Sequence, residues 1–205
     1  MPTLYHHPYS QHARRVVSLL EAASLPYELH RVALEKGEHR SPEFLALNPN
    51  HQIPVFIDGE LVLFESHAIC RYLCAKHGLT QWYPSDLSTR AKIDQWLDWN
   101  QCRLFPTVRD IVLNKVFLGP DGDVAAIARG EAALPELMAI LDAGLADRDF
   151  LAGSTATLAD LSVASNIFQL GLAEIAPDSP HIARWYQRVG QIEGFRKSLP
   201  PTTMA

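Results

Sequence analysis

The order of strand and helix signals in the first eighty residues is the feature that most restricts how this chain can fold. Apolar residues recur at strand spacing in some stretches and at helical spacing in others. The stretches are, in order, a strand at 3–5, a helix after Ser10, a strand at 27–32, a short helix from Pro42 to Asn48, strands at 55–57 and 61–64, and a helix from Ser66 to about Gly78. Asp58-Gly59 joins the last two strands and is typical of a tight hairpin turn. The order is therefore βαβ followed by αββα.

This connectivity resembles the thioredoxin fold, in which helices sandwich a small mixed sheet. We expect such a thioredoxin-like βαβαββα domain over residues 1–80, a linker over 81–87 and an all-helical domain over 88–205. In the last of these, Thr157 and Asp160 form a capping-box pattern ahead of a helix that is apolar almost all round. A helix of that kind is buried, so we expect it at the centre of the helical domain.

Two long helices are predicted before that central helix, one over 88–117 and one that ends near Ala146. Pro106 is expected to kink the first, because proline removes a backbone donor and clashes with the preceding turn. Gly130 and Pro135 are expected to weaken or bend the second.

Charge and cysteine content exclude several classes of function. The net charge of −5 provides no electrostatic footprint for nucleic acid or for an anionic membrane surface. No apolar run approaches membrane-spanning length, and the first residues form no signal pattern. Cys70, Cys74 and Cys102 form no disulfide framework, and no metal-ligand spacing accompanies the cysteines or histidines, so we predict no metal site. These features favour reduced thiols in a cytoplasmic protein.

The stretch His7-Pro8-Tyr9-Ser10 lies at the strand-to-helix turn, where a thioredoxin-like redox protein would carry Cys-Pro-Tyr-Cys. Ser10 can cap the helix, or it can aim its hydroxyl at a bound sulfur or oxyanion. The glycines of a hydrolase nucleophile elbow are missing around it, so a hydrolytic triad is disfavoured.

Two further stretches could meet a peptide-like ligand. A cis bond before Pro54 would turn the N–H and C=O of Ile53 outward, where they could pair with a ligand as a strand does. Ser66 opens a helix, where free N–H groups and the helix dipole favour an anion, and the neighbouring Glu65 favours an ammonium group. The pair Glu65-Ser66 therefore suits the zwitterionic end of an amino acid.

These stretches together resemble the cytosolic glutathione transferase family, in particular its serine-type delta and theta classes, in a bacterial style. The matching patterns are Pro8-x-Ser10 with Arg14, Lys36-Gly37-Glu38-His39, Asn48-Pro49-x-His51-x-Ile53-Pro54, Glu65-Ser66-x-Ala68-Ile69 and Thr157-x-x-Asp160. The resemblance covers the whole chain and is densest over residues 1–78. It implies a cytoplasmic, homodimeric enzyme that adds the thiolate of glutathione, its co-substrate, to small electrophilic hydrophobic molecules.

The resemblance also implies a role for each matched residue. Ser10 would donate its hydroxyl to the glutathione sulfur, with Tyr5 as the alternative because other classes use a tyrosine at the end of the first strand. The residues expected to bind glutathione are His39, His51, Gln52, Ile53, Glu65, Ser66 and His67. His67 is a departure, because the delta class usually has arginine there and a histidine near neutral pH replaces that charge only in part.

Tyr9, Phe105 and Arg109 are candidates for the wall of an electrophile pocket, which we expect between the two domains because ligand sites favour such interfaces. Two other functions stay open at the level of sequence. A glutathione-dependent thiol–disulfide reductase would need cysteine at His7 or Ser10. A non-catalytic glutathione- or ligand-binding protein would keep the binding residues without turnover, and the intact Ser10 argues against it.

Overall fold

The computed structural model describes residues 1–201, and these residues divide into two compact units. Unit 1 comprises residues 1–79 together with residues 191–201, and unit 2 comprises residues 80–190. The sequence pattern assigns all of 88–205 to the helical domain, whereas the structure groups residues 191–201 with unit 1. Residues 202–205 lie outside the described part. No helix within residues 1–201 is long and apolar enough to cross a membrane.

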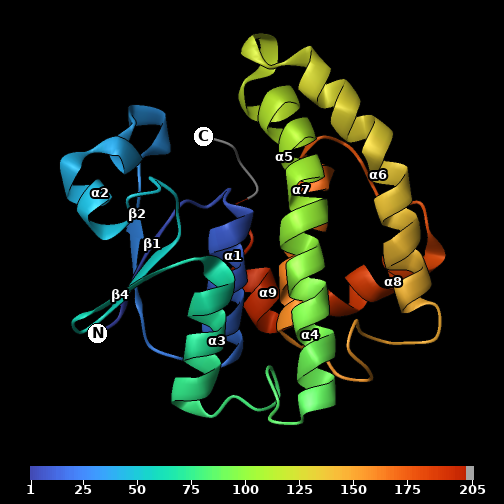
Figure 1. Cartoon of the computed structure of the whole chain (residues 1–205), viewed down its shortest axis with the longest axis horizontal. Coiled ribbons are helices and arrows are strands. Elements are labelled where there is room, and N and C mark those ends of the chain that lie inside the picture. Colours follow the sequence, from blue (N-terminus) through green and yellow to red (C-terminus); the bar gives the residue numbers. More distant parts are fainter. Residues whose placement is uncertain (202–205) are drawn as a thin grey trace. The chain divides into compact units, whose positions relative to one another are not determined.

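Unit 1 is built on a four-stranded mixed sheet (Figure 1). Its elements are β1 (Thr3–His6), α1 (Gln11–Ala22), β2 (Glu28–Arg31), the 3-10 turns η1 (Leu34–Lys36) and η2 (Glu38–Arg40), α2 (Pro42–Leu47), β3 (Val55–Asp58), β4 (Leu61–Phe64), α3 (Ser66–His77) and α9 (Glu193–Lys197). The strand order is β2-β1-β3-β4, with β1 and β2 parallel and the other pairs antiparallel. The predicted thioredoxin-like connectivity is confirmed.

The two faces of this sheet are covered by different helices, α2 on one side and α1 with α3 on the other (Figure 1). Side chains alternate between the faces along each strand. Tyr5 and its register partner Val55 pack with Phe44 of α2. Leu4 and its partner Phe56 are fully buried, and the Phe56 ring lies 6.4 Å from the Tyr72 ring of α3. Helix α1 lies on this same side of the sheet as α3 (Figure 1), and it begins a few residues after β1 ends at His6. The start of α1 is therefore next to the carboxyl end of β1.

Helix α9 belongs to unit 1 because it packs closely on α1. A Cβ on Gly194 would lie 2.4 Å from both the Ser18 carbonyl oxygen and the Ala22 nitrogen, so only glycine fits this approach. The buried Ser18 hydroxyl donates to the Ser198 hydroxyl over 2.8 Å. These contacts join residues far apart in the sequence, which is why helical spacing alone assigned this segment to the other domain.

Unit 2 is all-helical. Its elements are α4 (Leu87–Trp99), the π-helical segments η3 (Asn100–Leu104) and η4 (Leu113–Phe117) on either side of α5 (Phe105–Val112), the 3-10 turn η5 (Gly119–Asp121), α6 (Val124–Leu145), α7 (Leu158–Leu172) and α8 (Pro180–Val189). Pro106 lies at the start of α5, directly after the first π-helical segment. Proline cannot donate to the carbonyl four residues earlier, and a widened turn before it accommodates the missing bond.

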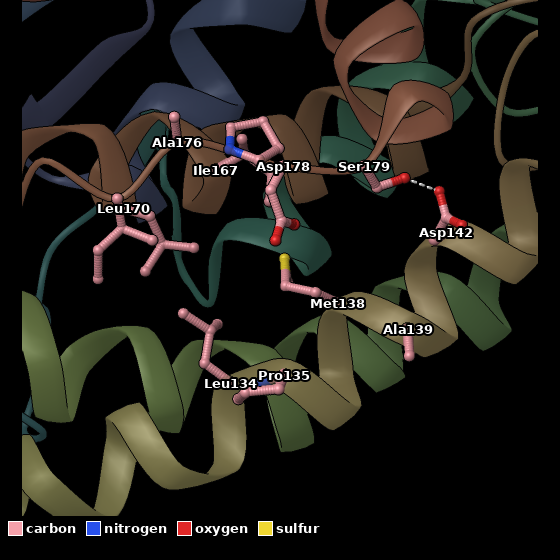
Figure 2. Close-up of a pocket in the computed structure, with 12 residues that line it drawn as sticks. Leu134, Pro135, Met138, Ala139, Asp142, Ile167, Leu170, Ala176, Asp178 and Ser179 are labelled. Carbon is pink, nitrogen blue, oxygen red and sulfur yellow. Dashed lines mark hydrogen bonds between the residues drawn. The ribbon is translucent and has the colours of Figure 1, made fainter.

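The long helix α6 is unbroken, although Gly130 and Pro135 lie within it. Gly130 lets α6 approach α5 closely, since a Cβ there would lie 2.7 Å from the Ile111 side chain and 3.0 Å from the Thr107 carbonyl oxygen. Where α6 approaches α7, a cavity of about 380 Å³ remains, with Met138 and Asp178 among its lining residues (Figure 2). The tertiary packing of α6 therefore outweighs the weakening that the sequence predicts.

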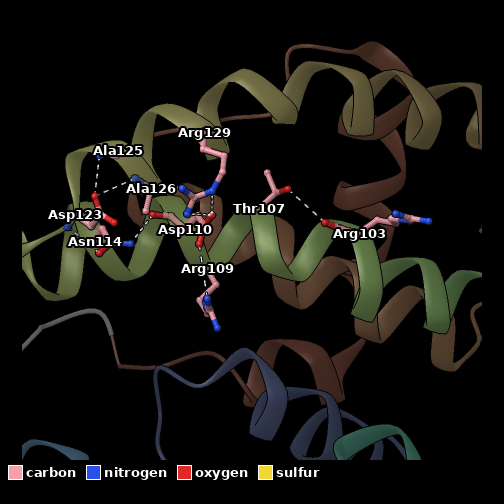
Figure 3. Close-up of polar contacts among 9 residues, drawn as sticks. All are labelled: Arg103, Thr107, Arg109, Asp110, Asn114, Asp123, Ala125, Ala126 and Arg129. Carbon is pink, nitrogen blue, oxygen red and sulfur yellow. Dashed lines mark hydrogen bonds and ion pairs between the residues drawn. The ribbon is translucent and has the colours of Figure 1, made fainter.

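Helices α5 and α6 pack against each other as a helical hairpin, and polar side chains connect them near the turn that joins them (Figure 3). Arg129 donates from Nε and Nη2 to the Asp110 carboxylate over 3.0 and 2.7 Å. Asn114 donates to the Asp110 carbonyl over 2.8 Å and accepts from the Asp123 N–H over 3.0 Å. Asp123 in turn caps α6 by accepting from the N–H of Ala125. The hairpin is thus held by side chains as well as by helix packing.

Helix α7 is the buried centre of unit 2, as its composition predicts. Its first turn is held by Asp160, which is fully buried. The Asp160 carboxylate accepts from the Thr157 N–H over 2.8 Å, the Leu151 N–H over 2.9 Å and the Trp185 indole over 2.8 Å. Burial raises the pKa of Asp160, and these hydrogen bonds oppose that effect. The Thr157–Asp160 pair therefore anchors three segments of unit 2 at one carboxylate.

Candidate functional site

Ser10 occupies the N-cap position of α1 in an extended backbone conformation, with φ −81° and ψ 113°. Its hydroxyl oxygen accepts from the Ala13 N–H over 3.2 Å, and its own N–H donates to the His7 carbonyl over 2.9 Å. A serine hydroxyl has one proton and two lone pairs, so this cap uses a lone pair and leaves the proton. Within residues 1–201, no acceptor for that proton is found. Capping α1 and donating to a ligand are therefore compatible roles.

The loop before α1 is supported from inside the unit. Arg14 is only 2% exposed, and its guanidinium lies 3.5 Å from the Pro8 carbonyl oxygen. The N–H of Tyr9 lies 3.3 Å from Nδ1 of His7, and the two rings are 6.0 Å apart. Burial, followed by the positive charge of Arg31, lowers the pKa of His7, so this histidine is neutral near pH 7. His7 thus contributes to the loop through its ring rather than through a charge.

Tyr5 lies in a different environment from Ser10. Its ring centroid is 4.4 Å from that of His30 and 6.2 Å from that of Phe44. It belongs to the hydrophobic cluster under α2, whereas Ser10 opens a helix that covers the opposite face of the sheet. The ring of Tyr5 is therefore part of the packing of unit 1.

The loop that follows α2 is organised by Asn48, which is 2% exposed. Its side-chain amide donates to the Gln52 carbonyl over 2.7 Å, and its side-chain oxygen accepts from the Asn50 N–H over 3.1 Å. His51 takes up a left-handed conformation with φ +46°, and the Ile53–Pro54 peptide bond is cis. The local sequence around Asn48 indicates only a turn, since an Asn-Pro pair at a helix end is a turn signal, and it does not indicate these side-chain hydrogen bonds. Asn48 holds the ends of this loop together.

His39 and His51 lie close to one another although they come from separate turns. Their ring centroids are 6.5 Å apart. Burial lowers the pKa of His39, and the nearby Arg40 and His51 lower it further. The two residues expected at the glycine end of glutathione are thus neighbours, and His39 is neutral near pH 7.

At the start of α3, Glu65 adopts φ +70°, which is uncommon for a residue other than glycine and typical of functional loops. The next residue, Ser66, is 4% exposed, and its hydroxyl oxygen accepts from Nη1 of Arg15 over 3.3 Å. The same nitrogen lies 3.2 Å from Nε2 of His67. Burial, followed by the positive charges of Arg15 and Arg71, holds the pKa of His67 well below its ordinary value. His67 is therefore neutral near pH 7.

Arg15 is a residue of this site that the local sequence does not identify. It lies among apolar residues of α1 that face the interior and is 1% exposed. No local pattern distinguishes it from a charged residue on the outer face of the helix, because its partners lie about fifty residues further on.

The candidates for an electrophile wall are distributed over both units. Tyr9 belongs to unit 1 and is half-buried. Phe105 and Arg109 lie one turn apart in unit 2, on α5. The Arg109 side chain is 59% exposed and 3.8 Å from Asp110 (Figure 3). Their part in binding an electrophile stays a prediction.

The chain's own thiols do not provide a reactive sulfur in the interior. Cys70, Cys74 and Cys102 are all free, and the first two are buried. Burial raises the pKa of Cys70, and it raises that of Cys74 to about 12. Among residues 1–201, no group of three or more His, Cys, Asp or Glu side chains could hold a metal ion.

The β2-β1-β3-β4 sheet with its helices, followed by an all-helical unit, defines the fold of the glutathione S-transferases. Comparisons with known proteins agree. Residues 2–75 match the family described as "Glutathione S-transferase, N-terminal domain", and residues 124–188 match "Glutathione S-transferase, C-terminal domain". Glutathione S-transferase GstB of Escherichia coli (strain K12) is 34% identical over 203 residues, which cover 96% of this chain and 97% of that protein.

Solved structures of the same family are also similar. The crystal structure of human glutathione transferase theta-2, in complex with glutathione and an unknown ligand, has a TM-score of 0.90 at 31% identity and covers 97% of this chain and 86% of that one. A delta-class glutathione transferase from Nilaparvata lugens has a TM-score of 0.88 at 30% identity, covering 97% and 93%. The chain therefore belongs to the glutathione S-transferase family and is an enzyme of that family. Identity is about the same to the theta, delta and bacterial relatives, so the comparisons support the family rather than one class.

Proposed function

We propose that this enzyme activates the thiol of glutathione through the hydroxyl of Ser10 and adds the resulting thiolate to small, mostly apolar electrophiles. The observation that carries the proposal is the Ser10 cap. Its oxygen accepts from its own helix while its proton stays available at the positive end of α1. A serine there donates a hydrogen bond and keeps its proton, so it needs no neighbouring base.

The size of this effect is sufficient for catalysis near neutral pH. A free thiol has a pKa of about 8.5, so only a few per cent is thiolate, and the thiolate is the nucleophile. A hydrogen bond to a charged group contributes roughly 1.5–3 kcal/mol. Since about 1.4 kcal/mol corresponds to one pH unit, Ser10 would lower the thiol pKa by about one to two units. The thiolate would then be a large fraction of bound glutathione at pH 7.

We propose that the rest of unit 1 holds glutathione along its length. The backbone of Ile53 pairs with the cysteinyl unit, and the neighbouring Gln52, together with His39 and His51, meets the glycine end. Two observations support this assignment: the His39 and His51 rings lie 6.5 Å apart, and Asn48 fixes the loop that carries Gln52.

The γ-glutamyl end is assigned to the start of α3. The exposed carboxylate of Glu65 suits the ammonium group, and the hydroxyl of Ser66 suits the carboxylate. In the reaction, the thiol proton leaves to solvent, the sulfur forms a bond to the electrophilic carbon, and a leaving group departs with the bonding pair or a proton is taken up. Ser10 stays protonated throughout.

We also propose that the enzyme works as a homodimer in the cytoplasm, for which the support is the family and the free state of all three cysteines. A thiol–disulfide reductase is disfavoured, since His7 and Ser10 stand where it would carry its cysteines and two of the three thiols are buried with raised pKa values.

The test combines retention on immobilised glutathione with conjugation of a chlorinated dinitrobenzene. Wild type, Ser10→Ala and the control Ser10→Thr, which keeps a hydroxyl, are compared. We expect all three to be retained, kcat of Ser10→Ala to fall about tenfold to a hundredfold, and Ser10→Thr to keep more activity than Ser10→Ala. Wild type that is not retained would contradict glutathione binding. Ser10→Ala with unchanged kcat would contradict the role of Ser10.

A further inference from the structure

The starting point is a missing charge at the start of α3. The resemblance to the delta class places an arginine at position 67, where it would meet the carboxylate of the γ-glutamyl unit. This chain has His67, whose pKa lies well below its ordinary value because the ring is buried close to Arg15 and Arg71. A neutral imidazole offers no net charge to a carboxylate. If glutathione binds here, another group must provide the positive potential.

We propose that Arg15 of α1 provides this charge and acts as a positioning residue for the γ-glutamyl carboxylate, through Ser66. The inference rests on the proposed binding of glutathione by unit 1. The guanidinium reaches across from α1 to the first turn of α3, with Nη1 3.3 Å from Oγ of Ser66 and 3.2 Å from Nε2 of His67. One cation thus contacts both residues that open the helix.

The direction of the first hydrogen bond determines what Ser66 can do. The guanidinium has only donors, so Ser66 accepts from it and keeps its own proton. With its oxygen fixed on the inner side, the Ser66 hydroxyl can donate outward to a carboxylate. A hydrogen bond received from a cation polarises the hydroxyl and strengthens the bond that it donates. Arg15 therefore selects both the direction and the strength of the Ser66 donor.

The charge of Arg15 is permanent under working conditions. Burial lowers the pKa of Arg15 to about 10, and Cys70 and Glu65 oppose that effect. The group thus stays protonated near pH 7, whereas burial and Arg15 itself keep His12 neutral. A buried charge acts through a medium of lower effective dielectric than water, so it is weakly screened. The potential of Arg15 adds to that of the α3 dipole at the same place.

Arg15 is buried and does not face the ligand. In this it differs from the arginine that the resemblance to the delta class places at position 67. The side chain is 1% exposed, while Glu65, the acidic residue of the site, is exposed. Arg15 would therefore affect the affinity for the carboxylate without direct contact with it. It would leave the thiol chemistry at Ser10 unchanged, because the carboxylate is ionised both before and after the thiol loses its proton.

The test measures binding of S-methylglutathione and of its analogue that lacks the γ-glutamyl α-carboxylate, by calorimetry. Wild type is expected to bind the complete ligand at least tenfold more tightly. In Arg15→Gln this ratio is expected to fall to threefold or less. The double variant Arg15→Gln/His67→Arg, which returns a charge to the same turn, is expected to restore it. A merely structural role of Arg15 would lower both affinities together and would not be rescued at position 67.

An Arg15→Gln protein that binds with the wild-type ratio overturns the inference, and so does a double variant that restores nothing. If circular dichroism shows Arg15→Gln to be unfolded, the comparison is made with Arg15→Met, which keeps an unbranched side chain in the interior without the charge or the hydrogen-bond donors. Its ratio is expected to fall at least threefold, and an unchanged ratio overturns the inference. Wild type that binds neither ligand overturns the proposed function itself, and the two failures are thereby distinguished.

Discussion

Two helices of unit 1 begin at a serine of the proposed site, and the two serines lie in contrasting surroundings. Ser10 is half-buried, and its oxygen accepts from Ala13 of its own helix. Ser66 is 4% exposed and follows Glu65, and its oxygen accepts from the guanidinium of Arg15 on another helix. Each serine keeps its proton for a ligand. The two hydroxyls differ in the donor to their oxygen, which is a neutral backbone N–H for Ser10 and a charged guanidinium for Ser66.

We expect Ser10 to act in the chemical step and Ser66 to act in binding. The proposed partner of Ser10 is a sulfur that changes from neutral to charged, so a hydrogen bond there favours one protonation state and raises kcat. The proposed partner of Ser66 is a carboxylate that is charged throughout, so a hydrogen bond there binds ground state and transition state alike. A serine at the N-cap of α1 and a serine at the first position of α3 are thereby expected to control two separate kinetic constants.

The largest expected effect is on stability and concerns the start of α7. This helix is proposed to take part neither in thiol activation nor in glutathione binding. Asp160→Ala removes the acceptor for the N–H groups of Leu151 and Thr157 and for the indole of Trp185. Buried donors left unsatisfied cost about 1–3 kcal/mol each, so the free energy of unfolding should fall by about 3 kcal/mol or more. Urea denaturation measures it, and a loss below about 1 kcal/mol would show that the cap is dispensable. The KM for glutathione of the folded variant should stay unchanged.

The next effect is at the start of α3. Ser66→Ala should raise the KM for glutathione about fivefold to twentyfold, because it removes one charge-assisted hydrogen bond, worth roughly 1.5 kcal/mol. The kcat value at saturating glutathione should change by less than about twofold. Steady-state kinetics in glutathione decide the matter. A variant whose kcat falls at unchanged KM would place Ser66, and not Ser10 alone, in the chemical step.

A smaller effect is expected from three partly buried histidines below neutral pH. Burial lowers the pKa of His6 to about 4, and burial with nearby positive charges holds those of His12 and His67 well below 6.5. Below pH 6.5 the unfolded chain binds protons that the folded chain does not, so stability falls as the pH decreases from 7 to 5. His67→Asn should lose about 1–2 kcal/mol less over this range. Equal losses in both proteins, from urea denaturation at the two pH values, would show that folding does not lower the pKa of His67.

The smallest effect is expected at Tyr5. Its ring packs against His30 and Phe44 on the α2 face of the sheet, and the ring is retained in Tyr5→Phe. The kcat value for conjugation should therefore stay within about twofold of wild type. A fall to the level of Ser10→Ala would transfer the activating hydroxyl from Ser10 to Tyr5.

Much of unit 1 could be predicted from sequence because its elements depend on neighbouring residues. Asp58-Gly59 closes the β3–β4 hairpin, and Gly59 takes φ +63°. Ser10 and Ser41 both cap the helices that follow them. Such local signals identify the start of each element, and they also place the proposed catalytic serine at a helix N-terminus.

What could not be predicted depends on residues that are far apart in the sequence. Arg15 contacts Ser66 across 51 positions, so its place inside the site has no local signal. Gly194 packs on Ser18, which brings the end of the chain into unit 1. Pro106 shows the converse case, since a proline inside a helical pattern is a local signal of an irregularity, and a π-helical segment lies just before it.

The most direct test of the central claim is the pKa of the thiol of glutathione when it is bound to the protein. Ultraviolet absorbance of the thiolate, followed over pH in wild type and Ser10→Ala, measures it while both proteins are saturated with glutathione. We predict an apparent pKa about one to two units lower in wild type than in Ser10→Ala. Equal thiol pKa values in the two proteins would contradict activation of glutathione by Ser10.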